Sequence, residues 1–523
     1  MNPLIRGMAV RTLGSIGIEA VLDYLAEPLK DSMNDEDPYV RKTAALCVAK
    51  FHEISPERAE DFIPKLLMMI SDGNGMVVSN AIAAFTEIQA TREDAIVMTQ
   101  DILHKLLNAI PECSEWGRVY ILDFLAQNTP SKFKDVDETI QRVIPNLAHS
   151  NCAVVLSATK VIMKYMDFVQ GLDKIRSICR KLAPPLISLM GGDPEIQYIA
   201  IRNINLIIQK RPYVLDKEIR VFFCNYQDPL YVKLEKLEIM IKLADLKNVD
   251  QLLLELKDYA QEVDVQFVRK SISAIGRVAI KLERAADRCI QVLHELIRTK
   301  IDYVVQEAII VLKDIFRKYP NRYEGIIKDL CENLKALDNA ESRGSMIWII
   351  GQYCDLIDNS ITLMTDFAEN FKDEAKNVQL AILNAAVKMY LKLEGDAEEL
   401  VTNVLQQATD ESDNPDLRNR GYIYWRMLSE NPEEAKKIIL CEKPTINEDQ
   451  GHIEPALLDK LIDNISMLSS VYYKTPDVFV KKIRDRINER LDLEQEDLDY
   501  DHGKQEDYVD SMGVKKSDYI KES

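Results

Sequence analysis

The strongest constraint on the fold is one short phrase that recurs along the chain. An Asp or Asn, often followed by Pro, precedes an apolar residue, a basic or polar residue and, one turn on, a small residue. It reads NPLIRGMA at 2–9, DPYVRKTA at 37–44 and NPDLRNRG at 414–421. Further copies begin near residues 151, 193, 228, 264, 302 and 373, with weaker ones near 73, 116 and 343. The spacing of roughly 34–42 residues indicates one structural unit repeated along the chain.

Each unit reads as two helices. Asp, Asn and Pro are typical of a helix start, where the side chain caps free N–H groups. In the second helix of the pair, Val or Ile then faces the core and Ala or Ser allows a neighbouring helix to approach closely. The first helix carries its own apolar stripe, as at Phe62, Leu66, Met69 and Ile70.

These patterns predict an all-α fold, a right-handed α-solenoid of the HEAT/armadillo kind with about twelve helix-pair repeats. A tetratricopeptide array is the alternative with two helices per unit. Its spacing is fixed near 34 residues and its Trp-Leu-Gly-Tyr phrase is missing here, so we disfavour it.

Composition agrees with long helices and excludes some functions. Only 18 Gly and 19 Pro occur in 523 residues, and 47% of the chain is apolar. The formal net charge of −19 disfavours nucleic-acid binding. Nine cysteines are scattered singly, which is typical of reduced core thiols in a cytosolic protein.

The two ends differ from the repeats between them. We expect a solenoid over 1–483 whose first repeat is incomplete, because NPLIRGMA is a second-helix phrase without its partner helix. We expect the natural protein to begin earlier, or another subunit to cover this end. Residues 484–523 are rich in charge and poor in aliphatics, which predicts a largely disordered tail. No secretory h-region and no apolar run long enough to span a membrane is present.

No pattern predicts chemistry. We find no catalytic, cofactor-binding or metal-binding residues, no Walker A loop and no GxSxG elbow, and we expect no enzyme activity and no cofactor. The three tryptophans, Trp116, Trp348 and Trp425, are interpreted as core or groove residues.

Basic pairs are the remaining candidates for a binding surface. They are Arg41-Lys42, Lys233 with Lys236, Arg269-Lys270, Arg317-Lys318 and Lys481-Lys482. We favour pairing with an Asp of the same or a neighbouring turn, and keep a basic strip for acidic partners or anionic lipids as the alternative. Residues that contact partners are left unassigned.

The wording of the phrases resembles the trunk of beta-adaptins, the beta large chains of the first and second clathrin adaptor complexes. The resemblance runs in order from Asn2 to about Val480, and includes NPLIRGMAVRTLG, DEDPYVRKTAALCVAK, QYIAIRNINLIIQKRP and NPDLRNRGYIYWRMLS. It implies the large-subunit scaffold of a heterotetrameric adaptor complex in vesicle-mediated protein transport and cargo sorting. The implied partners are a second large chain, a medium chain and a small chain.

The same resemblance implies a cytoplasmic protein, peripheral on the cytosolic face of Golgi, endosomal or plasma membrane. Clathrin, a small GTPase and phosphoinositide membrane are implied only through the assembled complex, because the matching helices and a complete clathrin box are not found in this sequence. The tail offers only Leu491-Asp492-Leu493-Glu494, which lacks the second apolar position. A HEAT-repeat nuclear-transport receptor or another solenoid scaffold stays as the alternative function.

Overall fold

A computed structural model describes residues 2–92, 95–128, 133–334, 337–393, 396–410, 412–442, 444, 446 and 453–479. Every regular element in these ranges is a helix, and no strand occurs there. The all-helical fold class expected from the repeat phrases is therefore confirmed.

The chain forms two compact units. Unit 1 comprises Met1–Leu189, Arg202–Lys210 and the described residues from Ile453 on, and unit 2 comprises Met190–Ile201 and Arg211–His452. Helix α12 (Pro194–Lys210) therefore contributes its first part to unit 2 and its second part to unit 1.

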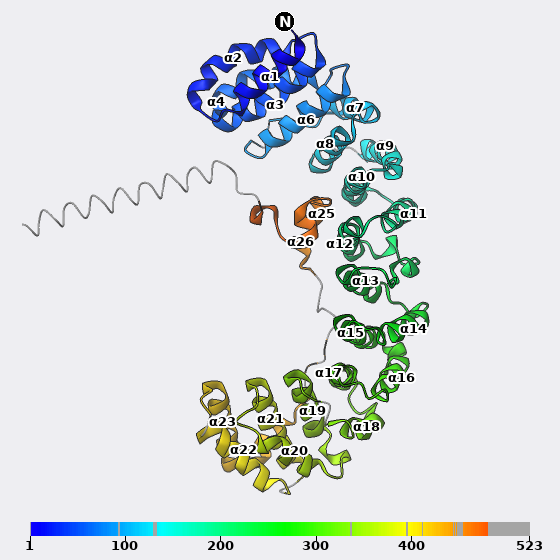
Figure 1. The fold of residues 1–523 in the computed structure, drawn as a ribbon, viewed down its shortest axis with the longest axis vertical. Helices are drawn as coiled ribbons and strands as arrows, with labels where there is room; N and C mark the ends of the chain where they lie inside the picture. The colour runs from blue at the N-terminus through cyan, green and yellow to red at the C-terminus, as the bar shows by residue number, and fades with distance from the viewer. Residues whose placement is uncertain are drawn as a thin grey trace, which may run out of the picture. The chain divides into compact units, whose positions relative to one another are not determined.

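Unit 1 has two layers of helices (Figure 1). Consecutive second helices of the pairs pack on one another and form the second-helix layer: α1 (Pro3–Ser15), α3 (Pro38–Ile54), α6 (Gly75–Gln89), α8 (Glu115–Gln127) and α10 (Cys152–Tyr165). The first helices form the other layer: α2 (Glu19–Met33), α4 (Pro56–Ala59) with α5 (Ile63–Met69), α7 (Gln100–Ala109), α9 (Phe133–Val143) and α11 (Leu172–Leu189).

Unit 2 repeats this arrangement. Its second-helix layer is α13 (Leu230–Leu243), α15 (Val265–Lys281), α17 (Asp302–Lys318), α19 (Ala340–Gln352), α21 (Lys376–Lys392) and α23 (Pro415–Glu430). Its first helices are α14 (Val249–Tyr259), α16 (Ala286–Ile297), α18 (Ile327–Cys331), α20 (Ser360–Glu369) and α22 (Glu398–Asp410). Before α13, two short 3₁₀ turns, Pro212–Val214 and Ile219–Phe222, stand in place of a first helix. With α12, the described residues hold twelve second helices, the number of repeats that the sequence predicts.

The repeat phrase starts these helices by the expected mechanism. The side chains of Asn2, Asp37 and Asn414 accept hydrogen bonds from amides two residues on, at 3.0, 2.8 and 3.1 Å. The following residue in each of these copies is a Pro in the first turn, where its missing N–H costs no hydrogen bond. Asn74, Asn151, Asp264 and Asn339 cap α6, α10, α15 and α19 in the same way.

Small residues set how closely the second helices approach. A Cβ added to Gly276 of α15 would lie 2.3 Å from Cγ1 of Val311 in α17, and one added to Gly351 of α19 would lie 2.6 Å from Cβ of Ala385 in α21. The apolar stripe of the first helices is buried as expected, with Phe62, Leu66 and Ile70 each at most 2% exposed. Within each unit, the core is thus one continuous layer of buried side chains between the two layers of helices.

The residues after the last repeat depart from the pairwise stacking. Helix α24 (Pro432–Ile439) follows α23, and the chain then supplies α25 (Pro455–Asp463), α26 (Leu468–Tyr472) and a 3₁₀ turn at Pro476–Val478. These last elements belong to unit 1 and lie beside α10 and α12 (Figure 1). We call residues 453–479 the docked segment.

Candidate partner-binding surface

One face of the second-helix layer is polar, and a segment of the same chain packs on it. In unit 1, the docked segment packs on α10 and on residues 202–210 of α12. In unit 2, the helices α17, α19 and α21 line an open groove. Both places use lysine, arginine, asparagine and aromatic side chains.

Two lysines of unit 1 pair with carboxylates of the docked segment. Lys164 of α10 donates to Asp463 at 2.6 Å. Lys210 of α12 donates to Asp459 at 3.0 Å and to Asp167 at 2.9 Å. Burial lowers the pKa of Lys210, but the hydrogen bonds and charges of Asp167 and Asp459 outweigh it and raise the pKa above the ordinary value. Asp167 and Asp459 of the docked segment therefore both favour the charged form of Lys210.

Side chains of α12 bind the backbone of the docked segment. Asn203 Oδ1 accepts from the amide of Ser466 at 3.3 Å, and Gln209 Oε1 accepts from the amide of Ile453 at 3.2 Å. Arg202 Nε donates to the carbonyl of Val471 at 2.6 Å. Asparagine, glutamine and arginine on a helix face thus bind backbone groups that lie between or at the ends of the short helices of the docked segment.

Tyr473 makes further contacts between the docked segment and α12. The guanidinium of Arg202 lies 3.5 Å from the centre of the Tyr473 ring. The Tyr473 hydroxyl accepts from Asn205 at 2.9 Å and donates to the carbonyl of Arg202 at 3.1 Å. Tyr473 itself has φ 55°, in the left-handed region. Leu461, Ile462 and Ile465 are at most 1% exposed, so apolar burial supports the polar contacts.

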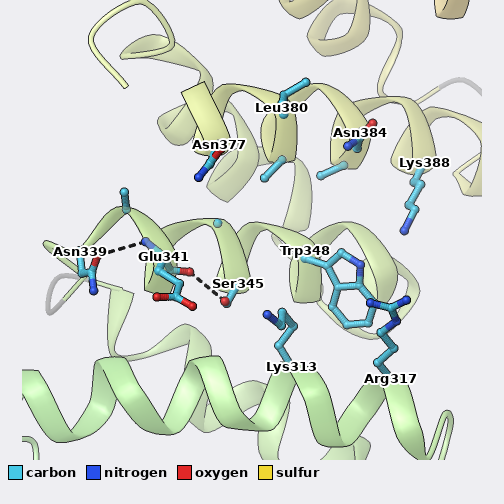
Figure 2. A pocket seen from close by; sticks show the side chains of 14 residues that line it. Lys313, Arg317, Asn339, Glu341, Ser345, Trp348, Asn377, Leu380, Asn384 and Lys388 are labelled. Atoms are coloured by element: carbon cyan, nitrogen blue, oxygen red, sulfur yellow. Dashed lines mark hydrogen bonds between the residues drawn. The ribbon is translucent and has the colours of Figure 1, made fainter. Parts of the chain in front are cut away.

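The groove of unit 2 has a volume of about 600 Å³ (Figure 2). Its small lining residues are Ala340, Gly344 and Ser345 of α19 and Ala381 and Ala385 of α21. Its larger lining residues are Lys313 and Arg317 of α17, the N-cap Asn339 with Glu341 and Trp348 of α19, and Asn377, Leu380, Asn384 and Lys388 of α21. The basic groups gather toward one end.

One end of this groove is basic and aromatic. Figure 2 shows Lys313, Arg317 and Lys388 extending from two helices toward Trp348. The Lys388 ammonium lies 5.5 Å from the centre of the Trp348 ring and donates to Gln352 at 3.0 Å. Lys313 lies 3.4 Å from Asp314. Three cations and one neighbouring carboxylate leave this end positive in a chain of net charge −19.

Amides lie toward both ends of the groove. At the end away from Arg317, Asn377 is exposed and Asn339 accepts from the amide of Glu341. The Glu341 carboxylate is the acidic group of this end. Asn384 lies near Lys388 (Figure 2) and accepts a hydrogen bond from the Tyr424 hydroxyl at 2.7 Å.

Two of the basic residues singled out from the sequence, Arg41 and Lys233, are in ion pairs that join neighbouring repeats. Arg41 pairs with Asp72 at 2.8 Å and Lys233 with Glu262 at 2.7 Å. Arg6 with Asp35, at 2.7 Å, and Arg343 with Glu374 are pairs of the same kind. Each basic side chain comes from a second helix, and each carboxylate from the turn that follows the next first helix. We call these the seam ion pairs.

The seam ion pairs support the interpretation that we favoured for the phrase-borne basic residues. Lys236 similarly pairs with Asp228 of its own turn at 2.6 Å. The hydrogen bond of Arg6 to Asp35 is the main reason why the pKa of this carboxyl lies below its ordinary range. Burial raises the pKa of Glu307, and Arg269 and Lys270 lie close enough to oppose this rise. Lys481 and Lys482 lie outside the described residues.

Arg317 and Lys318 of α17 do not belong to the seam ion pairs. Arg317 is exposed at the basic end of the groove, and Lys318 donates to the backbone carbonyl of Ile446 at 2.9 Å. Sequence reasoning found these residues but not the groove, because its other walls come from α21, whose Asn377, Asn384 and Lys388 carry no signal in the phrase.

The tryptophans and cysteines are placed as follows. Trp348 lines the groove, and Trp425 is half exposed in a smaller hollow between α22 and α23. Trp116 is 67% exposed at the start of α8, so a core position is wrong for Trp116. Five cysteines are buried, and burial raises the thiol pKa of Cys47 and Cys113 to about 11.

In the described part of the chain, no cluster of ligating side chains could hold a metal ion, and no helix is long and apolar enough to cross a membrane.

The fold and this surface define the class of protein: a helical-repeat scaffold whose second-helix layer binds polypeptide. The sequence pattern of the family described as "Adaptin N terminal region" matches residues 1–432. The chain belongs to this adaptin family.

Sequence similarity to named proteins agrees with this family assignment. The chain is 54% identical over 486 residues to "AP-1 complex subunit beta" of Dictyostelium discoideum, and 53% identical over 495 residues to "AP-1 complex subunit beta-1" of Mus musculus. These matches cover 92% and 94% of this chain and 52% of each relative. Against "AP-2 complex subunit beta" of Schizosaccharomyces pombe it is 42% identical, over 92% of this chain and 72% of the relative. The chain thus spans about half the length of the first two relatives.

Solved structures support the fold. A homology model of the full-length AP-3 complex has a chain with a TM-score of 0.58 at 16% identity, covering 82% of this chain and 79% of that one. The crystal structure of Kap121p has a TM-score of 0.52 at 13% identity, covering 89% and 52%. At such identities the likeness extends to the helical-repeat fold alone.

Proposed function

We propose that this chain is the large-subunit scaffold of a heterotetrameric clathrin-associated adaptor complex, in vesicle-mediated intracellular protein transport and cargo sorting. The single observation that supports this most is the identity of 53–54% to beta chains of AP-1 complexes over more than nine-tenths of the sequence. The role is one of binding and holding other chains, not of catalysis.

The partners in this proposal are a second large chain, a medium chain and a small chain. The geometry supports such a role because the second-helix layer already binds polypeptide through lysine, asparagine and arginine side chains, at the docked segment. Contacts with clathrin, a small GTPase and phosphoinositide membrane belong to the assembled complex. The site of action in the proposal is the cytosolic face of Golgi, endosomal or plasma membrane.

A nuclear-transport receptor is the rival function. The likeness to Kap121p, at 13% identity, extends to the fold only, whereas the adaptin match covers residues 1–432 in sequence. We therefore keep the adaptor as the proposal.

Affinity purification of the full chain with a C-terminal tag from its own cells tests this proposal. We expect three further adaptor chains in equal amounts, one of the large, one of the medium and one of the small class, and co-migration of all four in size-exclusion chromatography. Recovery of the chain alone as a stable monomer, or with a nuclear small GTPase in place of adaptor chains, contradicts it.

A further inference from the structure

We propose that the groove lined by α17, α19 and α21 is a second polypeptide-binding site, for an extended acidic segment supplied in trans by a partner protein. The site is separate from the seat of the docked segment in unit 1. It does not depend on which complex the chain joins.

The docked segment shows what chemistry this helix layer uses to bind polypeptide. Lysines of α10 and α12 bind Asp463 and Asp459, amide side chains bind backbone groups, and Arg202 stacks on Tyr473. Unit 2 provides a second example, because Lys318 of α17 donates to the backbone carbonyl of Ile446.

The groove of unit 2 carries the same set of groups. Lys313, Arg317 and Lys388 supply cations, Asn377 and Asn384 supply amides, and Trp348 supplies an aromatic face. Asn377 and Asn384 are seven residues apart on α21, a rise of about 10 Å along a helix, which matches about three residues of extended chain. The small side chains that line the groove let the backbone of a bound peptide come close to α19 and α21.

The charges select an acidic occupant. Asp314 faces Lys313 at the basic end, and Gln352 accepts from Lys388. The exposed Arg317 has no such contact among the described residues, and Glu341 lies at the opposite end. A carboxylate beside Arg317 and Lys313, with its neighbouring side chain on Trp348, satisfies the basic end, while Asn377 and Asn384 bind backbone along the groove. A groove lined by amides along its length favours a peptide over a lipid headgroup, which needs cations alone.

Fluorescence anisotropy with the full chain tests the site. The probe is a labelled synthetic peptide in which Asp and Glu alternate with Leu and Tyr, and the matched probe has Asn and Gln in place of the acids. We expect saturable binding of the acidic probe only, weakened by salt. Arg317→Glu should weaken it about tenfold or more, which is the effect of losing one charge-assisted contact and adding a repulsive one.

Arg298→Glu is the matched control, because Arg298 is exposed at the end of α16, in the first-helix layer of the same unit, and the net charge changes equally. Circular dichroism melting shows that each variant is folded. Trp348→Phe identifies the groove independently, since it should remove the change of tryptophan fluorescence that the probe causes.

Three results would overturn the site. These are binding unchanged in Arg317→Glu, equal weakening in Arg298→Glu, and Arg317-dependent binding of phosphoinositide vesicles without binding of the acidic peptide. Recovery of the four adaptor chains does not depend on these results, so failure here leaves the proposed function intact.

Discussion

At the scale of single residues, two kinds of contact join neighbouring repeats. Glycines such as Gly276 and Gly351 let second helices touch, and the seam ion pairs join four of the second helices to the turn after the next first helix. Both kinds are partly visible in the sequence. The phrase predicts a small residue and a basic residue at fixed places, but the acidic partner lies 29 to 31 residues away and is found only in the fold.

Two glycines of α19 allow a matched test of close approach. In Gly351→Ala the new Cβ would meet Cβ and Cα of Ala385 at 2.6 and 2.8 Å, so backbone must move, and we expect a loss of about 1–3 kcal/mol of unfolding free energy. In Gly344→Ala the nearest atom is 4.0 Å away, and the higher helix propensity of Ala should be neutral or stabilise by up to about 1 kcal/mol. Denaturant titration followed by far-UV circular dichroism measures both. Equal effects of the two changes contradict the packing argument.

Glu307 of α17 gives a pH-dependent prediction. Burial, and to a smaller extent the charge of Glu341, raise the pKa of Glu307 above its ordinary value of 4.5, although Arg269 and Lys270 oppose this. A carboxyl with a raised pKa binds more protons in the folded than in the unfolded state, so its contribution to stability is lost as pH rises past 4.5. Glu307→Gln should therefore raise the melting temperature more at pH 7 than at pH 4.

The control for this effect is Glu369→Gln, at an exposed position at the end of α20. We expect little change in the melting temperature there at either pH. A gain from Glu307→Gln that is the same at both pH values contradicts the assignment to burial of this carboxylate.

At the scale of elements, the docked segment distinguishes this chain from a plain array of helix pairs. Its sequence carries no repeat phrase, yet it is fixed by buried Leu461, Ile462 and Ile465 and by the contacts of Tyr473. The helix pairs were predictable because capping residues and apolar periodicity are local. The position of the docked segment on α10 and α12 could not be predicted. It depends on contacts between residues up to 309 positions apart, made by single polar side chains.

Adjacent tyrosines test what holds the docked segment. Tyr473→Ala removes the stack on Arg202 and both hydroxyl hydrogen bonds, so we expect faster amide hydrogen exchange over residues 461–473 and earlier cleavage by trypsin after the flanking Lys460 and Lys474. Tyr472→Ala is the control, since Tyr472 is 59% exposed and its ring contacts Phe479. Exchange that is equally fast in both variants would show that Tyr473 does not hold the segment.

At the scale of the whole molecule, the two units share one design in which first helices form one layer and second helices present a polar, polypeptide-binding face. The repeat count, the all-helical class and the membership in the adaptin family were predictable from the phrases. The groove was not, because its walls combine three helices whose polar residues occupy different positions of the repeat. The role of the second-helix layer as the surface for partner chains is the central claim.

Hydroxyl-radical footprinting of side chains tests this claim most directly. The full chain is labelled alone and within the purified assembly, and oxidation is read by mass spectrometry at Trp348 of the groove and at Tyr24, which is 78% exposed on the first helix α2. We predict that oxidation of Trp348 falls severalfold in the assembly while that of Tyr24 is unchanged. Protection of Tyr24 with Trp348 unchanged would contradict the account.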